Sequence, residues 1–410
     1  MTPGGGEISD TTRPDWRALV AIITAIQAVL ALMTRTLPLF GLPLTLAAGI
    51  APAAAGQMAA ATSLGSMLYF LWGPTFMVGT SAQRQLQGGA ILTALAVLLC
   101  LSGNWGLILL GALLIGVGYG PSAPAGSDLL MRIVPARRRG LAFSIKQAGV
   151  PVGGLAAGLI LPIVAMRYGL SGALWLAAAI ALSASLLLGF WSGALARVEG
   201  PLRQAALPRF AELMRAPLRL FRMILGDPRL RLITYAGLGL GLAQGVLLAY
   251  YPVILTDHVG YSLAAAGMAF ALLQGLGIVG RVFLGWLSDR IARERAVLAF
   301  LCVASGVTML LIATLGPRSP TALVASLSAL AGITVVSWNG VFLSLLAASA
   351  PEGQVGEVTA AGTFVLFSAF VVSPLVAQLF FAGGEGYAAG LVLAGLAPLV
   401  SAALLAFHRP

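Results

Sequence analysis

Three basic side chains stand inside apolar stretches of this sequence, where no water is available to solvate their charge. They are Arg35, Lys146 and Arg281. Holding such a group in hydrocarbon is costly unless it faces water, a partner or a ligand. All 13 acidic residues fall in polar tails, in loops or at the ends of the apolar runs. Because no carboxylate is placed to pair with these cations, their pattern predicts a binding site for a small anionic molecule.

An alternative interpretation is that these side chains reach to the lipid headgroups, as long basic residues near a membrane surface do. This is weakest for Arg281, which stands eight residues before Asp289 and therefore about 12 Å deeper along a helix. It is strongest for Lys146, which follows Arg139 by seven residues. Lys146 is nevertheless the single lysine among the 24 basic residues.

Amide and phenol side chains recur two helical turns away from basic or polar residues, a spacing that keeps both members on one helix face. The pairs are Gln27 with Arg35, Gln244 with Tyr251, and Gln274 with Arg281. We therefore expect Gln244, Tyr251 and Gln274 to complete a substrate-binding site around the cations, because their side chains can hydrogen-bond a polar ligand.

The elements that must position these residues are membrane helices. The chain has 410 residues, of which 59% are hydrophobic and 9% charged, whereas an ordinary soluble domain carries about 25% charge. A helix needs roughly 20 mainly apolar residues to cross a bilayer. The twelve runs of this kind are 18–46, 53–78, 87–103, 105–130, 141–166, 169–193, 231–256, 261–286, 295–315, 320–348, 355–382 and 386–407. We expect an all-α integral membrane protein with twelve transmembrane helices.

The net charge of +11 is concentrated at one membrane face. Nineteen of the 24 basic residues fall in the tails and in alternate loops, while the opposite loops hold Arg167 and Arg318. This positive-inside pattern predicts that both termini are cytoplasmic. It also argues against nucleic acid as a partner. We expect a monomeric, multi-pass protein of a bacterial inner membrane, with the lipid bilayer around it.

Few residues in this sequence could catalyse a reaction. There is no nucleotide-binding loop and no metal-ligand cluster, and the two histidines lie near span ends. Cys100 and Cys302 both lie within apolar runs, so they predict neither a metal site nor a disulfide framework. We therefore expect no enzymatic activity, no catalytic residue, no metal and no cofactor.

The two halves of the chain carry an internal repeat, which is typical of duplicated membrane transporters. A shift of 216 residues places Gly116 on Gly332 and Pro135 on Pro351. The predicted organisation is a cytoplasmic tail (1–17), two pseudo-symmetric six-helix bundles (18–193 and 231–410) and a cytoplasmic linker (194–230). In the linker, arginines alternate with Leu, Phe and Met, which indicates either an amphipathic helix on the inner leaflet or a solvated basic segment.

The end of the eighth run resembles the loop motif of the major facilitator superfamily. It reads GWLSDRIAR from Gly285 to Arg293. In that family the motif lies after spans two and eight, where its acidic and basic residues latch one conformation. The resemblance implies a conformational latch formed by Gly285, Asp289, Arg290 and Arg293. The first-half copy near 73–84 lacks the aspartate, so the latch is expected to depend on the second half.

The same resemblance implies which helices line the substrate path. Spans one, four, seven and ten do so in the family, which brings Tyr119, Trp338 and Asn339 to the expected site. Trp338 fits equally well as a packing aromatic. The stretch RRGLAFSIKQAGVPVG (138–153), together with Arg281 before the loop motif, resembles the monocarboxylate and oxalate/formate branch. There the corresponding arginine pairs with the substrate carboxylate.

These observations predict a secondary active transporter of a small organic anion, with a carboxylate as the first candidate and a proton as the candidate coupling ion. The alternative within transport is efflux of amphipathic drug-like compounds. The alternative of another class is a membrane sensor or receptor that does not transport.

Overall fold

The structure is a computed structural model, and it describes residues 15–407 apart from 78, 136–138, 194, 196–217, 219–221, 292–293, 318, 352–354 and 383–385. Within these residues the chain forms helices and no strands. Polar side chains begin four of them, where Asp15, Ser81, Asn104 and Asp227 each accept a hydrogen bond from a backbone N–H of the first turn. Such N–H groups have no partner inside the helix, so each cap fixes where its helix begins.

The described residues of the first half form six shorter helices and one long, bent helix. In order they are α1 (Trp16–Leu39), α2 (Gly41–Ala47), α3 (Ala55–Phe76), α4 (Ala82–Leu99), α5 (Trp105–Tyr119), α6 (Pro124–Ile133) and α7 (Arg139–Phe190). The 3₁₀ turns η1 (Pro52–Ala54), η2 (Cys100–Ser102) and η3 (Gly120–Ser122) join some of them.

The second half repeats this order. Its helices are α10 (Pro228–Val253), α11 (Leu263–Ile291), α12 (Glu294–Ile312), α13 (Thr321–Thr334), α14 (Asn339–Ala348), α15 (Val355–Ala382) and α16 (Gly386–Phe407). A π-helical turn, η5 (Ile254–His258), follows α10.

The spans agree with the predicted number once two irregular elements are counted. In the described residues ten helices are long and apolar enough to cross a membrane, and a pair bent by 118°, Gly41–Ala47 with Pro52–Gly73, supplies an eleventh span. One of the ten, Ile145–Phe190, has 46 residues, which is about 69 Å at helical rise and too long for one crossing. It breaks at Gly169, whose φ of 72° is a left-handed conformation open to glycine. Counted as two spans, it brings the total to twelve.

Two spans that the sequence predicts as continuous are broken in the structure. The run 105–130 is interrupted by η3, where Pro121 and Pro124 remove backbone donors, and the run 320–348 is interrupted between Thr334 and Asn339. The break in the second half contains no proline. There the Ser337 hydroxyl lies 2.6 Å from the carbonyl oxygen of Gly332 and 3.1 Å from that of Gly277 in α11.

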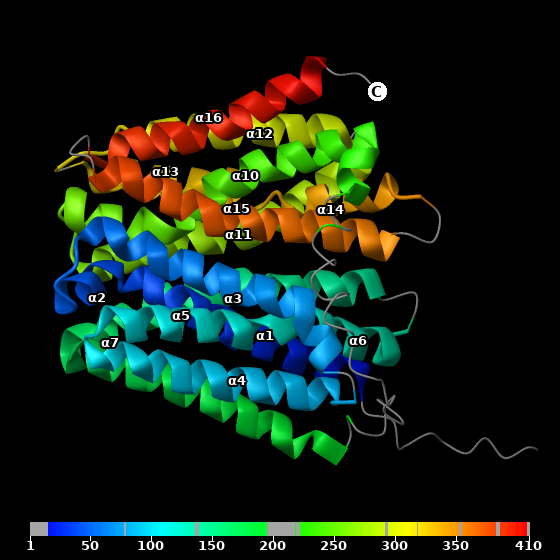
Figure 1. Cartoon of the computed structure of the whole chain (residues 1–410), viewed down its shortest axis with the longest axis horizontal. Helices are drawn as coiled ribbons and strands as arrows, with labels where there is room; N and C mark the ends of the chain where they lie inside the picture. The colour runs from blue at the N-terminus through cyan, green and yellow to red at the C-terminus, as the bar shows by residue number, and fades with distance from the viewer. Residues whose placement is uncertain are drawn as a thin grey trace, which may run out of the picture.

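The two halves form two bundles side by side, as Figure 1 shows, with α1–α7 in one and α10–α16 in the other. The 216-residue shift relates their helices. It carries Trp105, the start of α5, to Thr321, the start of α13, and Arg139, the start of α7, to Val355, the start of α15. The chain therefore has the twelve-helix, two-bundle fold that the sequence predicts.

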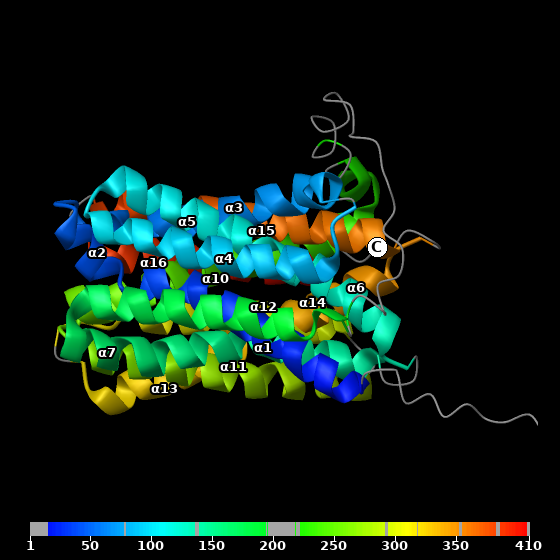
Figure 2. The ribbon, with the colours of Figure 1, turned by 90° about the horizontal axis from the view of Figure 1, so that it is seen from below.

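The bundles meet along two seams, visible on opposite sides of the molecule in Figure 2. One seam joins α3 to α15, and the other joins α7 to α11. In the second seam Gly158 and Gly267 face each other so closely that a Cβ on either would meet the backbone oxygen of the other. Small residues allow this approach of helices in lipid.

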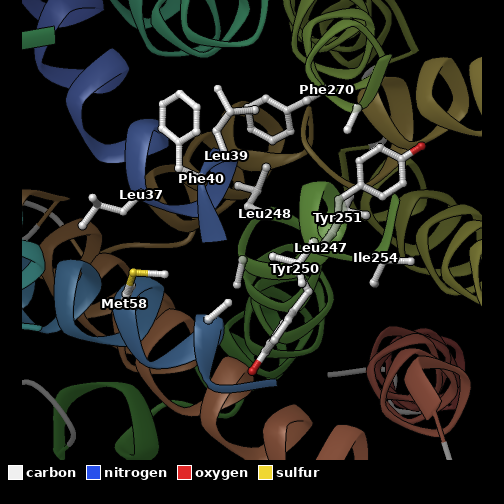
Figure 3. Close-up of a cluster of buried hydrophobic side chains, with 14 of the residues drawn as sticks. Leu37, Leu39, Phe40, Met58, Leu247, Leu248, Tyr250, Tyr251, Ile254 and Phe270 are labelled. Atoms are coloured by element: carbon white, nitrogen blue, oxygen red, sulfur yellow. The ribbon is translucent and has the colours of Figure 1, made fainter. Parts of the chain in front are cut away.

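One end of the bundles, where α2 lies, is closed by a buried cluster drawn in Figure 3. Leu39 and Phe40 at the end of α1 pack there with Leu247 and Tyr250 of α10. The Tyr250 hydroxyl lies 2.7 Å from the Ala53 carbonyl oxygen of the first half and 3.1 Å from that of Pro374. The phenol of Tyr250, a residue of the second bundle, thus bonds to the backbone of the first bundle and ties the two halves at this end.

Candidate functional site

A cavity of about 270 Å³ lies between the two halves. Helices α1, α3, α5 and α7 line it from the first half, and α10, α11, α14 and α15 line it from the second. Among the described residues that line it there is no aspartate or glutamate, while Arg35 and Arg281 are both present. The cavity therefore carries two positive charges and, within that lining, no compensating carboxylate.

Arg281 comes from α11 and spans the boundary between the halves. Its Nη2 donates to the Val336 carbonyl at 3.2 Å, and its Nη1 makes a long contact of 3.5 Å with the Gln147 carbonyl of the first half. Its Nε is buried without a hydrogen-bond partner. Carbonyl oxygens solvate the guanidinium but do not neutralise it, so Arg281 remains available to an anion.

Arg35 comes from the last turns of α1, on the first-half side of the cavity. Its Nε is buried, and among the described residues its side chain has no hydrogen-bond or ion-pair partner. The phenol of Tyr119 lies within Coulombic range of Arg35 and of Arg281, and the two guanidiniums lie within range of each other. Gln27 Nε2 donates to the same phenol oxygen at 3.4 Å. Tyr119 therefore joins the two cations into one cluster.

Several polar atoms of this cavity are left without a partner. Besides the two arginine Nε atoms, these are the side-chain carbonyl oxygens of Gln27, Gln244 and Asn339. An unsatisfied buried polar group costs about 1–3 kcal/mol. Such a concentration indicates that a ligand or water completes these hydrogen bonds.

The opposite wall of the cavity is aromatic. Phe70 of α3 meets Phe367 of α15 edge to face, with ring centroids 4.9 Å apart, and Phe367 meets Phe370 in the same manner at 5.6 Å. All three rings line the cavity. They belong to the α3–α15 seam, whereas Arg281 and Gln147 belong to the α7–α11 seam on the other side (Figure 2).

Of the nine substrate-binding residues predicted from the sequence, the structure brings five to this cavity. They are Arg35, Tyr119, Gln244, Arg281 and Asn339. Lys146 and Trp338 are the immediate neighbours of lining residues but do not themselves line the cavity. The Lys146 ammonium, in a side chain 2% exposed, donates to the Ala123 carbonyl at 3.1 Å and to the Ser127 hydroxyl at 3.0 Å.

Trp338 is fully buried inside the second bundle, where its indole N–H donates to Val335 O at 3.0 Å and its ring packs on Phe342. This is the packing role that the sequence left open for it. Tyr251 also points away from the cavity, and its hydroxyl is 2.6 Å from that of Ser328. Figure 3 shows Tyr250 and Tyr251 directed to different sides of α10. Gln274 is buried against Gly154 of α7.

The predicted latch is described only in part. Gly285 has open space where a Cβ would be, and the Arg290 guanidinium lies 5.4 Å from the centre of the Trp286 ring. The Asp289 side chain and Arg293 lie outside the described residues. The latch stays a prediction.

Sequence reasoning missed the aromatic wall and Gln147. Helical spacing carried a signal for the aromatic wall, because Thr62, Ser66 and Phe70 follow one another every four residues along one face of α3. Thr363, Phe367 and Phe370, spaced four and three residues apart, lie along one face of α15.

The sequence profile of the Major Facilitator Superfamily matches residues 24–374, which covers most of the chain and all the lining of the cavity. The chain belongs to the Major Facilitator Superfamily. An uncharacterized MFS-type transporter of Mycobacterium tuberculosis, known from two strains, is 28% identical over 285 residues, a region that spans 68% of this chain and 60% of that relative.

The fold of this superfamily member also resembles a solved structure. A bacterial homolog of the human lysosomal transporter Spinster, in an inward-facing and unoccupied conformation, superimposes with a TM-score of 0.76 over 96% of each chain at 15% identity. This likeness concerns the fold. Together with the family match, it makes the protein a multi-pass membrane protein of the Major Facilitator Superfamily.

Proposed function

We propose that the protein is a secondary active transporter of a small organic anion, which it carries by alternating access. The observation that supports this is the pair of guanidiniums, Arg35 from the first half and Arg281 from the second, in a cavity whose described lining has no carboxylate. An anion between them contacts both bundles. Its binding energy is therefore available to change how the halves are arranged.

A carboxylate is the substrate group that fits these donors best. A guanidinium can grip a carboxylate through two parallel hydrogen bonds, and the Nε atoms of both arginines are still unpaired. Carriers of cations would need a negative charge in the same place, and the described lining offers none.

We further propose that the protein lies in a bacterial inner membrane with both ends of the chain in the cytoplasm. The arginine-rich loops alternate in that sense. In Figure 1, α1 begins and α16 ends at the same end of the bundles, opposite α2, as this orientation requires.

Binding and flux assays test the proposed substrate class. Purified protein is titrated with a panel of organic acids and of organic cations, and the best ligand is then followed into proteoliposomes. We expect acids alone to bind and to be transported. Arg281→Gln should lose about 2–5 kcal/mol of binding free energy, since its charge-assisted bonds lie in a largely desolvated site, and Arg281→Lys should keep only weak binding. Equal affinity of the Gln variant and the wild type for the acid would refute the anion site.

A further inference from the structure

The candidate site has two chemically different poles. At one pole Arg35, Arg281 and the Tyr119 phenol line the cavity. At the other pole Phe70, Phe367 and Phe370 present their rings to the same cavity. Arg281 belongs to the α7–α11 seam and the three phenylalanines to the α3–α15 seam on the opposite side, so a ligand that fills the cavity meets both.

The aromatic pole restricts which anions fit. A second carboxylate placed against the three phenyl rings would lose its hydration, and burying such a charge is strongly unfavourable. The nearby hydroxyls of Thr62, Ser66 and Thr363 already donate to backbone carbonyls. A dianion is therefore a poor ligand, unless both charges fold back to the cationic pole. An apolar body, by contrast, gains from leaving water at that wall.

The shape of the aromatic pole favours a ring. Phe70 and Phe367 already meet edge to face across the two halves, and Phe367 and Phe370 do so within α15. Aromatic pairs prefer these geometries and gain beyond the area they bury. A volume of about 270 Å³ suits a ligand with one ring, because drug-sized ligands occupy pockets of about 300–1,000 Å³.

We propose that the substrate is an aryl monocarboxylate, with its carboxylate between Arg35 and Arg281 and its ring against Phe70, Phe367 and Phe370. This inference rests on the proposed anion transport and names the chemical class of the anion. The phenylalanines then act as specificity-determining residues that contact the substrate body.

The test compares acids that share one negative charge but differ in their bodies. Benzoate, cyclohexanecarboxylate and acetate are titrated into the purified protein, together with terephthalate, a dianion whose second carboxylate is held at the far end of the ring. We expect benzoate to bind at least about tenfold more tightly than acetate, ahead of cyclohexanecarboxylate, and terephthalate to bind more weakly than benzoate.

Substitutions in α15 test whether the preference for benzoate comes from the aromatic wall. Phe367→Ala should weaken benzoate about tenfold and leave acetate unchanged, because it removes only the ring contact. Phe380→Ala is the matched control, since Phe380 lies on the same α15 helix, is 40% exposed and is not part of the cavity lining. If Phe367→Ala does not fold, Phe367→Leu and Phe70→Leu serve in its place and should lose the preference for benzoate over cyclohexanecarboxylate.

The outcomes separate this inference from the proposed function. Arg281-dependent binding of acetate or terephthalate with no preference for benzoate would overturn the aryl class and leave anion transport intact. Equal loss of benzoate and acetate in Phe367→Ala would also overturn it. Failure of every acid to bind would remove both proposals together.

Discussion

At the scale of single residues, the structure separates two kinds of buried cation. Arg35 has no hydrogen-bond partner among the described residues, and Arg281 has only carbonyl oxygens. The Lys146 ammonium, in contrast, donates hydrogen bonds to the Ala123 carbonyl and the Ser127 hydroxyl. These bonds link α7 to the start of α6. Arg35 and Arg281 line the cavity and Lys146 does not, so a ligand there contacts the arginines and not the lysine.

We predict from this difference that Lys146→Met leaves anion affinity within about threefold of the wild type, a change of well under 1.4 kcal/mol. The substitution removes a basic charge from the membrane, as Arg281→Gln does, but at a side chain that does not line the cavity. Titration of both variants with the same acid makes the comparison. An equally large loss in both would mean that the cavity responds to overall positive charge rather than to direct contact.

The same residues show where sequence reasoning reaches its limit. The residue types and their helices were predictable, because a charge or an amide inside an apolar run needs an explanation. The side of each helix that faces the cavity was not predictable. These helices are apolar on all sides, so their sequence pattern does not show which side is turned inward. Successive side chains along a helix point about 100° apart. Gln147 and Asn339 therefore line the cavity, whereas their neighbours Lys146 and Trp338 do not. Prediction of the fold class depended only on the lengths of the apolar runs and on the internal repeat, and the structure confirmed it.

At the scale of helices, the two halves share equivalent close contacts between helix backbones. Gly116 of α5 lies against Thr62 and Ser66 of α3, so closely that a Cβ would overlap their backbone. Its counterpart Gly332 of α13 lies in the same way against the backbone of Leu273 and Gly277 in α11. The helix that each glycine touches carries lining residues of the cavity. These two contacts therefore set the positions of equivalent walls.

We predict that Gly116→Ala and Gly332→Ala each destabilise the protein by about 1–3 kcal/mol, because a methyl group must push two backbones apart. Thermal unfolding in detergent measures the effect. Gly88→Ala in α4 is the matched control, since nothing lies within 4 Å of its Cβ position. It should be neutral or slightly stabilising, as expected for alanine in a helix. Unchanged stability of both packing variants would show that the helices separate at no cost.

At the scale of the whole molecule, hydrogen bonds hold the halves together at the end where α2 lies. Besides the contact of Tyr250 with Ala53, Gln57 Nε2 of α3 donates to Gln378 Oε1 of α15 at 3.1 Å, and Trp105 Nε1 of α5 donates to Gln57 Oε1 at 2.9 Å. The proposed alternating access requires this end to open in one state. The two bonds that join the halves, Tyr250 to Ala53 and Gln57 to Gln378, must then break in each cycle.

We predict that tethering Gln57 to Gln378 stops transport. Both are changed to cysteine in a protein whose native Cys100 and Cys302 are replaced by alanine, and a short bifunctional methanethiosulfonate links them. Flux should stop when the link forms and return when a reductant breaks it, while the unlinked double variant transports normally. The Gln57→Cys single variant treated with the same reagent is the control. Flux that continues through the linked protein would show that this end need not open.

The two guanidiniums would also make the proposed transport cycle sensitive to the membrane potential. Arginine keeps its proton under any physiological condition, so a cavity with Arg35 and Arg281 and no carboxylate in its described lining presents two charges to whichever side it faces. Each elementary charge moved across the potential difference is worth about 2.3 kcal/mol per 100 mV. In the proposed transport cycle, a negative cell interior would therefore hold the empty carrier facing inward, and a bound monoanion would remove half of that restraint. Membrane voltage and substrate would then jointly set how often the carrier turns outward.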